Sequence, residues 1–202
     1  MAERSFSESD LVPNPLALFS AWFGEAVRAG ERQPEAMALA TTDGSGHPAV
    51  RFVLLKSWDD RGFVFYTNAE SRKGVELRAN PSTALALRWE RLERQVRVEG
   101  RASPVDPAES DAYFATRGRP SQVSAWASDQ SRPLSGRGEL ERQAAEAEAR
   151  YAGSHVPRPP HWYGWRVRPE AIEFWQGRDN RLHDRFAYLR ASDGWSITRL
   201  SP

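Results

Sequence analysis

The sequence predicts a mainly β protein with inserted helices, an α+β fold organised as a closed or split antiparallel barrel. Two observations lead to this class. About nine short runs rich in β-branched and aromatic residues follow one another along the 202 residues. Asp/Gly turn clusters separate several neighbouring runs, where a doubly wound sheet would have crossover helices. The sequence shows no internal repeat and no GxGxxG, P-loop, HExxH or GxSxG pattern.

The N-terminal half combines one long helix with strands. Residues 1–13 are expected to be a flexible lead-in, and residues 14–202 a single domain. Asn14 and Pro15 predict an N-cap and a first helical residue, and the apolar stripe that follows ends before Gly30, a suitable stop. A short helix over 71–77 and five strands are then expected, the strands over 37–42, 49–58, 63–67, 83–89 and 94–105.

The C-terminal half begins with helices and ends with strands. Asp106 and Glu109 have the spacing of a capping box, with Pro107 at the first helical position. This helix is expected to end near Thr116. A stiff proline-rich linker is expected over 156–160. Two further helices and four strands complete the prediction, over 120–127, 138–151, 162–168, 171–176, 183–190 and 195–200.

The composition narrows the function. Lys and Arg number 28 against 27 Asp and Glu, a net charge of +1 that argues against a general nucleic-acid binder. The absence of cysteine excludes disulfides, thiolate metal sites and thiol nucleophiles. The four histidines lie too far apart for a zinc motif, so no metal is expected. Without a long apolar run or a signal-peptide core, no membrane partner is expected and the cytoplasm is the expected location.

The first cluster of polar residues joins a strand to the start of a helix. Arg51 is the first residue of the string RFVLLK and Lys56 the last. Ser71, Arg72 and Lys73 begin the short helix. Helix N-terminal amides and a forked guanidinium suit a phosphate dianion. The alternative is a solvated strand edge with an ordinary helix cap, and the pattern alone leaves both interpretations open.

A second cluster lies on the helix predicted after Asp106. Tyr113 and Arg117 are four residues apart and so share a helix face, and Ser121 follows after a turn. An aromatic ring, a cation and a hydroxyl could together hold a phosphorylated aromatic ring. From the residues alone, an ordinary helix surface that stops at Gly118 is favoured.

A third cluster lies near the C-terminus. If the chain is extended there, Arg181, His183 and Arg185 point to the same face. Such a face is costly to bury without an anionic partner, so a polyanion or a redox-active ring is a reasonable ligand. His183 by itself would be interpreted as a structural histidine.

Several strings of residues are similar to those of one known family. The strings are RFVLLK at 51–56, FYTNxxSRKG at 65–74, LERQVRVEG at 92–100, SQVSAWASDQS at 121–131, PRPPHW at 157–162 and EFWQGRDNRLHDRF at 173–186. In this order, and over about residues 14–202, they resemble the pyridoxine/pyridoxamine 5′-phosphate oxidase family.

The resemblance implies a split β-barrel homodimer with flavin mononucleotide (FMN) bound between the subunits. It also implies oxidation of pyridoxine or pyridoxamine 5′-phosphate to pyridoxal 5′-phosphate, with hydride passing to the flavin and O₂ reoxidising it to give H₂O₂. Carried over position by position, the FMN contacts fall on Arg51, Phe52, Val53, Leu54, Leu55, Lys56, Tyr66, Thr67, Arg72, Lys73, Gln95, Gln130, Ser131, Trp175 and Arg185.

The substrate contacts implied by the resemblance fall on Lys56, Tyr113, Arg117, Ser121, Arg181 and His183. The first four would hold the substrate phosphate, and Arg72 and Lys73 the FMN phosphate. Arg181 and His183 are the expected catalytic residues, over the pyridine ring. We expect Arg181 to position the ring and stabilise charge, and His183 to help the substrate lose the proton of its alcohol or amine.

The chain departs from the family pattern at a few positions. Arg88 and Gly118 stand where the family usually has proline, Ser124 where it usually has glycine, and the segment before the first helix is short. These departures leave room for a changed substrate. One alternative is a related flavin oxidase of secondary metabolism, of the phenazine-pathway type, which would not need the substrate-phosphate residues. Another is a non-catalytic binder of FMN or pyridoxal phosphate, which would not need Arg181 and His183.

Overall fold

A computed structural model describes residues 6–202, in which nine strands form one antiparallel sheet. The order along the sheet is β2-β1-β5-β6-β7-β4-β3, and β8 pairs with β7 and carries β9. This antiparallel sheet curls into a half-barrel, which confirms the predicted α+β class with a split antiparallel barrel. The strands are β1 Ala36–Thr42, β2 Pro48–Leu54, β3 Ser57–Asp59, β4 Gly62–Asn68, β5 Ser82–Trp89, β6 Arg94–Pro104, β7 Trp162–Gln176, β8 Asp184–Ala191 and β9 Gly194–Arg199.

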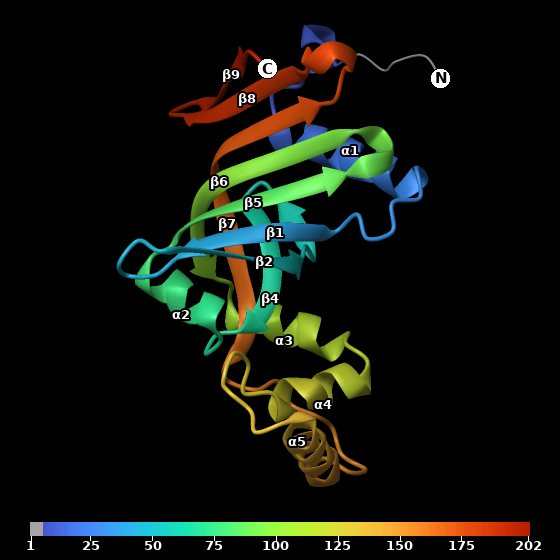
Figure 1. Ribbon diagram of the computed structural model, residues 1–202, viewed down its shortest axis with the longest axis vertical. Coiled ribbons are helices and arrows are strands. Elements are labelled where there is room, and N and C mark those ends of the chain that lie inside the picture. The colour runs from blue at the N-terminus through green and yellow to red at the C-terminus, as the bar shows by residue number, and fades with distance from the viewer. Residues whose placement is uncertain (1–5) are drawn as a thin grey trace.

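The helices lie around this sheet at separate places. In Figure 1, β8 and β9 occupy one end of the long axis and α3 to α5 the other, while α2 lies beside β4. β7 is the strand that connects the two ends, because it pairs with β4 at its start and with β8 at its finish. The helices are α1 Pro15–Arg28, α2 Arg72–Ala79, α3 Pro107–Ala115, α4 Arg119–Ala127 and α5 Arg137–Arg150.

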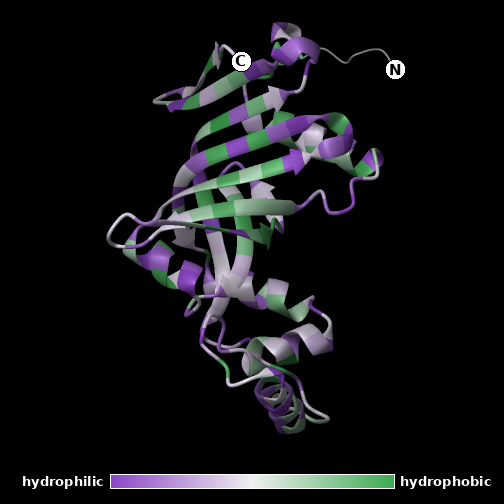
Figure 2. Ribbon diagram, in the orientation of Figure 1, coloured by the Kyte–Doolittle hydropathy of each residue, from purple (hydrophilic) through white to green (hydrophobic). Residues whose placement is uncertain are grey.

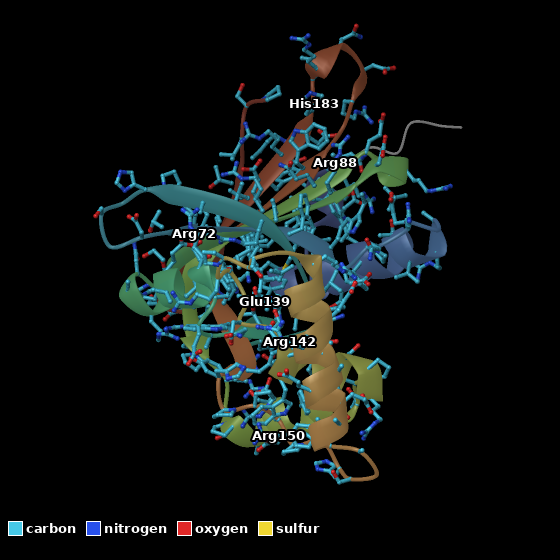
Figure 3. The ribbon with its side chains drawn as sticks, turned by 60° about the horizontal axis from the view of Figure 1, so that its bottom comes forward. Arg72, Arg88, Glu139, Arg142, Arg150 and His183 are labelled. Carbon is cyan, nitrogen blue, oxygen red and sulfur yellow. The ribbon has the colours of Figure 1, made fainter. Side chains whose placement is uncertain are left out.

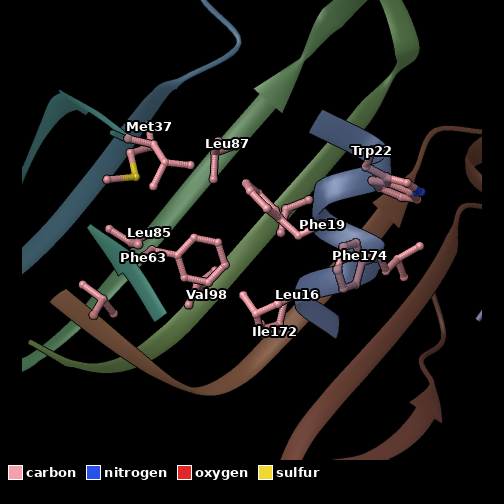
Figure 4. Packing of buried hydrophobic residues seen from close by; sticks show 14 of the residues in the cluster. Leu16, Phe19, Trp22, Met37, Phe63, Leu85, Leu87, Val98, Ile172 and Phe174 are labelled. Atoms are coloured by element: carbon pink, nitrogen blue, oxygen red, sulfur yellow. The ribbon is translucent and has the colours of Figure 1, made fainter. Parts of the chain in front are cut away.

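Helix α1 begins where the sequence predicts and fills the concave side of the sheet. The Asn14 side chain accepts a hydrogen bond from the Leu16 amide at 2.9 Å. Phe19 then meets Phe63 of β4 edge-on, with ring centroids 4.9 Å apart, and Trp22 meets Phe174 of β7 at 5.2 Å (Figure 4). Burying each of these aromatic side chains contributes about 1.5–3 kcal/mol, so α1 is held by the core rather than by its caps.

Strand alternation separates a core face from an outer face of the sheet. Leu87, Val96, Phe174 and Phe186 are cross-strand neighbours on β5 to β8 and are buried. The residues next to them in sequence must point the other way, because successive side chains in a strand alternate. Figure 2 shows the resulting alternation of hydrophobic and hydrophilic residues along β5 and β6. The outer face is therefore polar and available to ligands.

A second, smaller buried cluster lies under α3 to α5. Phe114 of α3, Val123 of α4, Tyr151 and Val156 pack there with Trp162 at the start of β7. The predicted N-cap of α3 is confirmed, since the Asp106 carboxylate accepts from the Ala108 amide at 2.8 Å. The capping box is not completed. Its predicted second member, Glu109, instead pairs with Arg166 of β7 at 2.7 Å, and that ion pair ties α3 to the sheet.

The division of the chain into strands differs from the prediction at two places. The strand expected over 49–58 is divided into β2 and β3, because at Leu55 and Lys56 the backbone changes partners, from Glu35 to Val64. The strands expected over 162–168 and 171–176 form the single strand β7. Pro169 does not end β7 because it lies at a register shift opposite Gly100, and a bulge tolerates a residue without an N–H.

The segment before α1 also differs from the expected flexible lead-in. Residues 1–5 lie outside the described part of the chain. Phe6 is buried, with its ring 4.9 Å from both Trp22 and Phe186. Glu8 pairs with Arg199 of β9 at 2.7 Å. From Phe6 onward, the segment is therefore attached to α1, β8 and β9.

Candidate active site

A cavity of about 500 Å³ opens between β2, β4, α3 and α4. We call it the main cavity. Its lining combines residues predicted to contact FMN with residues predicted to contact the substrate. The lining residues are Phe52, Val53, Leu54, Lys56, Tyr66, Thr67, Asn68, Lys73, Tyr113, Arg117, Gly118, Ser121, Gln130 and Trp162.

Lys73 brings a positive charge to one wall of the main cavity. The Ser71 hydroxyl caps α2, which places Lys73 in the first turn of that helix. The Lys73 ammonium donates to Gln130 Oε1 at 2.7 Å and to Thr67 Oγ1 at 3.2 Å, both neutral acceptors. Burial, with a smaller contribution from repulsion by Arg51, lowers the pKa of Lys73 to about 8. An anion bound here would stabilise the charged form of Lys73.

A buried carboxylate holds two arginines behind this wall. Glu76 accepts hydrogen bonds from Arg51 Nη2 at 2.9 Å, from Arg72 Nε at 2.7 Å and from the Thr41 hydroxyl at 2.5 Å. Burial alone would raise the pKa of Glu76, but these three donors outweigh it and the pKa is lowered. The Arg72 side chain remains 62% exposed (Figure 3). Glu76 thus fixes two guanidinium groups near the first turn of α2.

Aromatic rings and one arginine form the opposite wall. Tyr66 stacks on Tyr113 with ring centroids 3.9 Å apart, and Trp162 stacks on Tyr66 at 5.4 Å. The Arg117 guanidinium lies 4.5 Å from the centroid of the Trp162 ring. Burial lowers the pKa of Arg117, and its buried Nη1 atom has no hydrogen-bond partner among residues 6–202. A buried donor left without an acceptor is costly, so this wall is suited to an anionic ligand.

Lys56 and Ser121 complete the polar lining of the main cavity. Lys56 lies in the break between β2 and β3, where its backbone amide donates to the Val64 carbonyl at 2.8 Å. Ser121 lies in the first turn of α4, where its amide bonds to Gly118 at 2.8 Å. The predicted substrate-phosphate residues Lys56, Tyr113, Arg117 and Ser121 therefore all line one cavity.

A second group, made of three predicted FMN contacts and Arg88, crosses the outer face of the sheet. Arg88, Gln95, Trp175 and Arg185 are successive cross-strand neighbours on β5 to β8, and we call them the β5–β8 row. The Arg88 guanidinium lies 5.5 Å from the Trp175 ring centroid. Arg185 pairs with Glu173 at 2.9 Å, and this hydrogen bond raises the pKa of Arg185. The row offers an aromatic surface bordered by cations.

The loop between β7 and β8 places the two predicted catalytic residues beside this row. The His183 ring lies 4.6 Å from the Trp175 ring, on which Arg88 also rests. Figure 3 shows His183 and Arg88 near each other. Arg181 is exposed and has a positive φ of 61°, next to Asn180 with a φ of 55°. Two consecutive left-handed residues produce a tight turn, which non-glycine residues adopt only where the surroundings hold them.

The predicted site residues thus fall into separate places within one chain. Leu55 is buried in the core, and Arg51 bonds to Glu76. Arg72 and Ser131 line a neighbouring cavity of about 380 Å³. Arg181 and His183 accompany the β5–β8 row, at the opposite end of the long axis from α3 and α4 (Figure 1). The predicted residues are therefore gathered at three places, which are the main cavity, the cavity lined by Arg72 and Ser131, and the β5–β8 row with the loop beside it.

Sequence reasoning did not assign four residues that shape the site. Asn68, Gly118 and Trp162 line the main cavity, and Glu76 holds Arg51 and Arg72. Asn68 and Trp162 lie within the strings FYTN and PRPPHW. The family resemblance therefore marks both positions, although their residue types alone suggest no chemical role. The Glu76 carboxylate lies one turn beyond Arg72 and could have been found by its i, i+4 spacing.

Residues 6–202 contain neither a cluster suited to a metal ion nor a membrane-spanning helix. This part of the chain has no group of three or more His, Asp or Glu side chains placed to hold a metal ion. None of its helices is long and apolar enough to cross a membrane.

Family comparison covers most of the chain. A model described as pyridoxamine 5′-phosphate oxidase matches residues 23–151, and one described as the pyridoxine 5′-phosphate oxidase C-terminal dimerisation region matches 162–202. Two similar proteins are named pyridoxine/pyridoxamine 5′-phosphate oxidase. The one from Rubrobacter xylanophilus is 58% identical over 97% of this chain and 90% of its own length. The one from Cupriavidus taiwanensis is 56% identical over 98% and 93%.

Solved structures agree with this assignment. PhzG from Burkholderia lata, in complex with tetrahydrophenazine-1-carboxylic acid, superposes with a TM-score of 0.93 at 34% identity over the whole of both chains. A pyridoxamine 5′-phosphate oxidase-related, FMN-binding protein from Nostoc punctiforme has a TM-score of 0.74 at 16% identity. It covers 95% of this chain and 100% of its own, and supports the fold alone. The chain belongs to the pyridoxamine 5′-phosphate oxidase family.

Proposed function

We propose that this protein is an FMN-dependent oxidase that converts pyridoxine 5′-phosphate and pyridoxamine 5′-phosphate to pyridoxal 5′-phosphate. One observation carries the choice of a phosphorylated substrate. Lys56, Tyr113, Arg117 and Ser121 line one cavity, and the buried Nη1 of Arg117 lacks an acceptor among residues 6–202. A phosphate oxygen supplies such an acceptor and is matched by the surrounding donors.

The residues around the first turn of α2 fit the phosphate of FMN. Lys73 is a half-buried ammonium bonded to neutral acceptors, and burial together with repulsion by Arg51 lowers its pKa. Arg72 extends from the same turn with most of its side chain exposed. We assign Thr67, Arg72, Lys73, Gln130 and Ser131 to holding this phosphate. When bound, FMN accepts the hydride that leaves the substrate C4′ and passes both electrons to O₂.

The residues of the chain then have to bind and orient the substrate. The phosphate donors fix one end of the substrate, so that C4′ is presented at a defined place. Pyridoxine phosphate and O₂ give pyridoxal phosphate and H₂O₂. Pyridoxamine phosphate also consumes water and releases ammonia. Arg181 is assigned to positioning the pyridine ring and stabilising its charge.

We propose that the complete site forms between two copies of the chain. Within one chain, Arg181 and His183 lie at the far end of the molecule from the main cavity (Figure 1). Val50 and Phe52 on the edge strand β2 are 70% and 77% exposed, an apolar stripe that runs to the cavity mouth. The family model described as a dimerisation region matches residues 162–202, which include Arg181 and His183. A homodimer would cover the stripe and bring the partner's β5–β8 row to FMN.

A related oxidase acting on a substrate without phosphate is the second candidate. The full-length similarity to PhzG favours it. The four substrate-phosphate residues in the main cavity and the greater identity to the named oxidases favour the first candidate. A non-catalytic binder is the third, and the arginine and histidine at positions 181 and 183 argue against it.

The test is to load the purified protein with FMN, add pyridoxine 5′-phosphate in air, and follow pyridoxal phosphate and H₂O₂. We expect equal amounts of both products, formed only with FMN. Unphosphorylated pyridoxine is the control and should react far more slowly. A yellow protein that oxidises neither pyridoxine nor pyridoxamine 5′-phosphate would refute the proposal and favour the second candidate. Flavin that bleaches with substrate and regains its colour in air would exclude the non-catalytic binder.

A further inference from the structure

The loop that carries Arg181 and His183 is closed by hydrogen bonds. The Gly177 amide donates to the Glu93 carbonyl at 2.7 Å, which anchors the start of the loop to the residue just before β6. The Leu182 amide donates to the Asp179 carbonyl at 3.2 Å across the left-handed turn. The Arg178 amide donates to Nδ1 of His183 at 3.1 Å. The His183 ring is thus part of the loop's own framework.

The direction of this last bond determines where the imidazole keeps its proton. A backbone amide can only donate, so Nδ1 of His183 must offer a lone pair. A neutral imidazole carries one N–H, which must then lie on Nε2. In the alternative tautomer, and in the doubly protonated ring, an Nδ1–H group would face the Arg178 N–H. Either form would require this bond to break.

The neighbours of His183 support a fixed ring. The ring contacts Trp175 at a ring-centroid distance of 4.6 Å, with the two ring planes tilted by 45°. His183 also borders a small cavity with Asp184 and Arg199, and those two groups pair with each other at 2.9 Å. Arg178 is 3.6 Å from Asp184. The neighbouring carboxylate of Asp184 is therefore engaged by two arginines, and the ring is held by a backbone donor and an aromatic face.

We propose that His183 acts in the oxidase reaction as a fixed Nε2–H hydrogen-bond donor and not as a base. This inference rests on the proposed function and replaces the role expected from the sequence. The donor would bind an oxygen or nitrogen lone pair of the substrate. In alcohol oxidation the C4′ hydride then leaves for the flavin while the hydroxyl proton passes to water, so His183 gains no proton. His183 binds and orients the substrate throughout the reaction.

The tautomer can be tested without any activity. We would label the histidines with ¹⁵N, record long-range ¹H–¹⁵N spectra of the flavin-free and flavin-loaded protein, and assign His183 by comparison with His183→Gln. We expect Nε2 in the position of a protonated ring nitrogen and Nδ1 in that of an unprotonated one, near neutral pH. A protonated Nδ1 would overturn the proposal, whether or not the protein oxidises B6 phosphates.

The chemical role is tested by a pair of substitutions. Glutamine can place an amide N–H near the position of Nε2, whereas asparagine can replace the Nδ1 acceptor but is too short to supply the distal donor. We expect His183→Asn to lower kcat/KM about tenfold more than His183→Gln does, the equivalent of one hydrogen bond. His155→Gln, at an exposed site outside the loop, is the control. Equal losses in both variants, with a histidine ionisation removed from the pH profile, would show that His183 is a base.

Discussion

The main cavity and the β5–β8 row differ in how their charges are balanced. In the cavity, Lys73 bonds to neutral oxygens and Arg117 retains a buried nitrogen without an acceptor among residues 6–202. In the row, Arg185 is paired with Glu173, and Arg88 rests on Trp175. This difference indicates that the two regions bind different parts of the ligands. The cavity has positive charge available for phosphate groups, while the row offers a compensated, aromatic surface for a ring.

The largest effect is expected from removing the cavity's unsatisfied cation. Arg117→Ala should lower kcat/KM for pyridoxine 5′-phosphate about 100-fold, because charge-assisted hydrogen bonds contribute about 1.5–3 kcal/mol each. Steady-state kinetics would measure this loss, and a fluorescence titration should show nearly unchanged affinity for FMN. Arg119→Ala is the matched control, since Arg119 pairs with Glu148 outside the cavity. If Arg117→Ala instead weakened FMN binding and left kcat/KM unchanged, Arg117 would belong to the FMN phosphate site and not to the substrate phosphate site.

The next effect concerns Glu76, which compensates two arginines when no phosphate is bound. Glu76→Gln should destabilise the flavin-free protein by about 3 kcal/mol, because removing one partner leaves buried charge uncompensated. With saturating FMN the loss should be smaller, since the phosphate would compensate Arg51 and Arg72 in part. Chemical denaturation with and without FMN measures both values, with the exposed Glu99→Gln as control. An equal loss of unfolding free energy with and without FMN would show that Glu76 is not coupled to the phosphate site.

The charge on Lys73 predicts a pH dependence of FMN binding. Its pKa is lowered to about 8, so the ammonium is present below pH 8 and lost above it. Because the phosphate favours the ammonium, the affinity for FMN should be constant below this pH and fall above it, by up to about tenfold per pH unit. Titrations from pH 7 to 9.5 would measure it. Lys73→Met should bind FMN more weakly and without this dependence, and a slope that persists in the variant would assign it to another group.

The smallest effect is expected in the row. Arg88→Gln removes a cation from the Trp175 ring, an interaction of about 0.5–1 kcal/mol at exposed sites. Affinity for FMN, measured by titration, should therefore change by less than about fivefold. A loss of FMN affinity as large as the loss of kcat/KM expected for Arg117→Ala would mean that the row contributes essential charge. The two regions would then not differ in the way described above.

Much of the fold follows from local sequence patterns. The caps of α1 and α2 at Asn14 and Ser71, and the alternation in β6, lie where the sequence predicts them. The strand count agrees only because two errors cancel, at the break before β3 and at Pro169 within β7. Both depend on which strand lies alongside, and a single sequence does not reveal that. Strand β7 contributes to both buried clusters, and the single domain expected over residues 14–202 stays a prediction.

The site was less accessible to sequence reasoning than the fold. Motif strings located the cations and aromatic residues, but only the structure shows that Glu76 holds Arg51 and Arg72. The role expected for His183 is a second example, because its hydrogen bond to the Arg178 amide depends on the left-handed turn at Asn180 and Arg181. Residue type suggests a base, whereas the hydrogen bond from the Arg178 amide to Nδ1 supports the proposed donor at Nε2.

The central claim is that the main cavity of one copy works with the β5–β8 end of the other. The direct test is to co-express Arg117→Ala and Arg181→Ala chains with different tags and purify the mixed dimer. Each variant alone should be strongly impaired. In the mixed dimer one site carries both changes and the other carries neither, so about half of the wild-type activity should return. A mixed dimer no more active than its parents would show that each site lies within one chain, and would contradict the account.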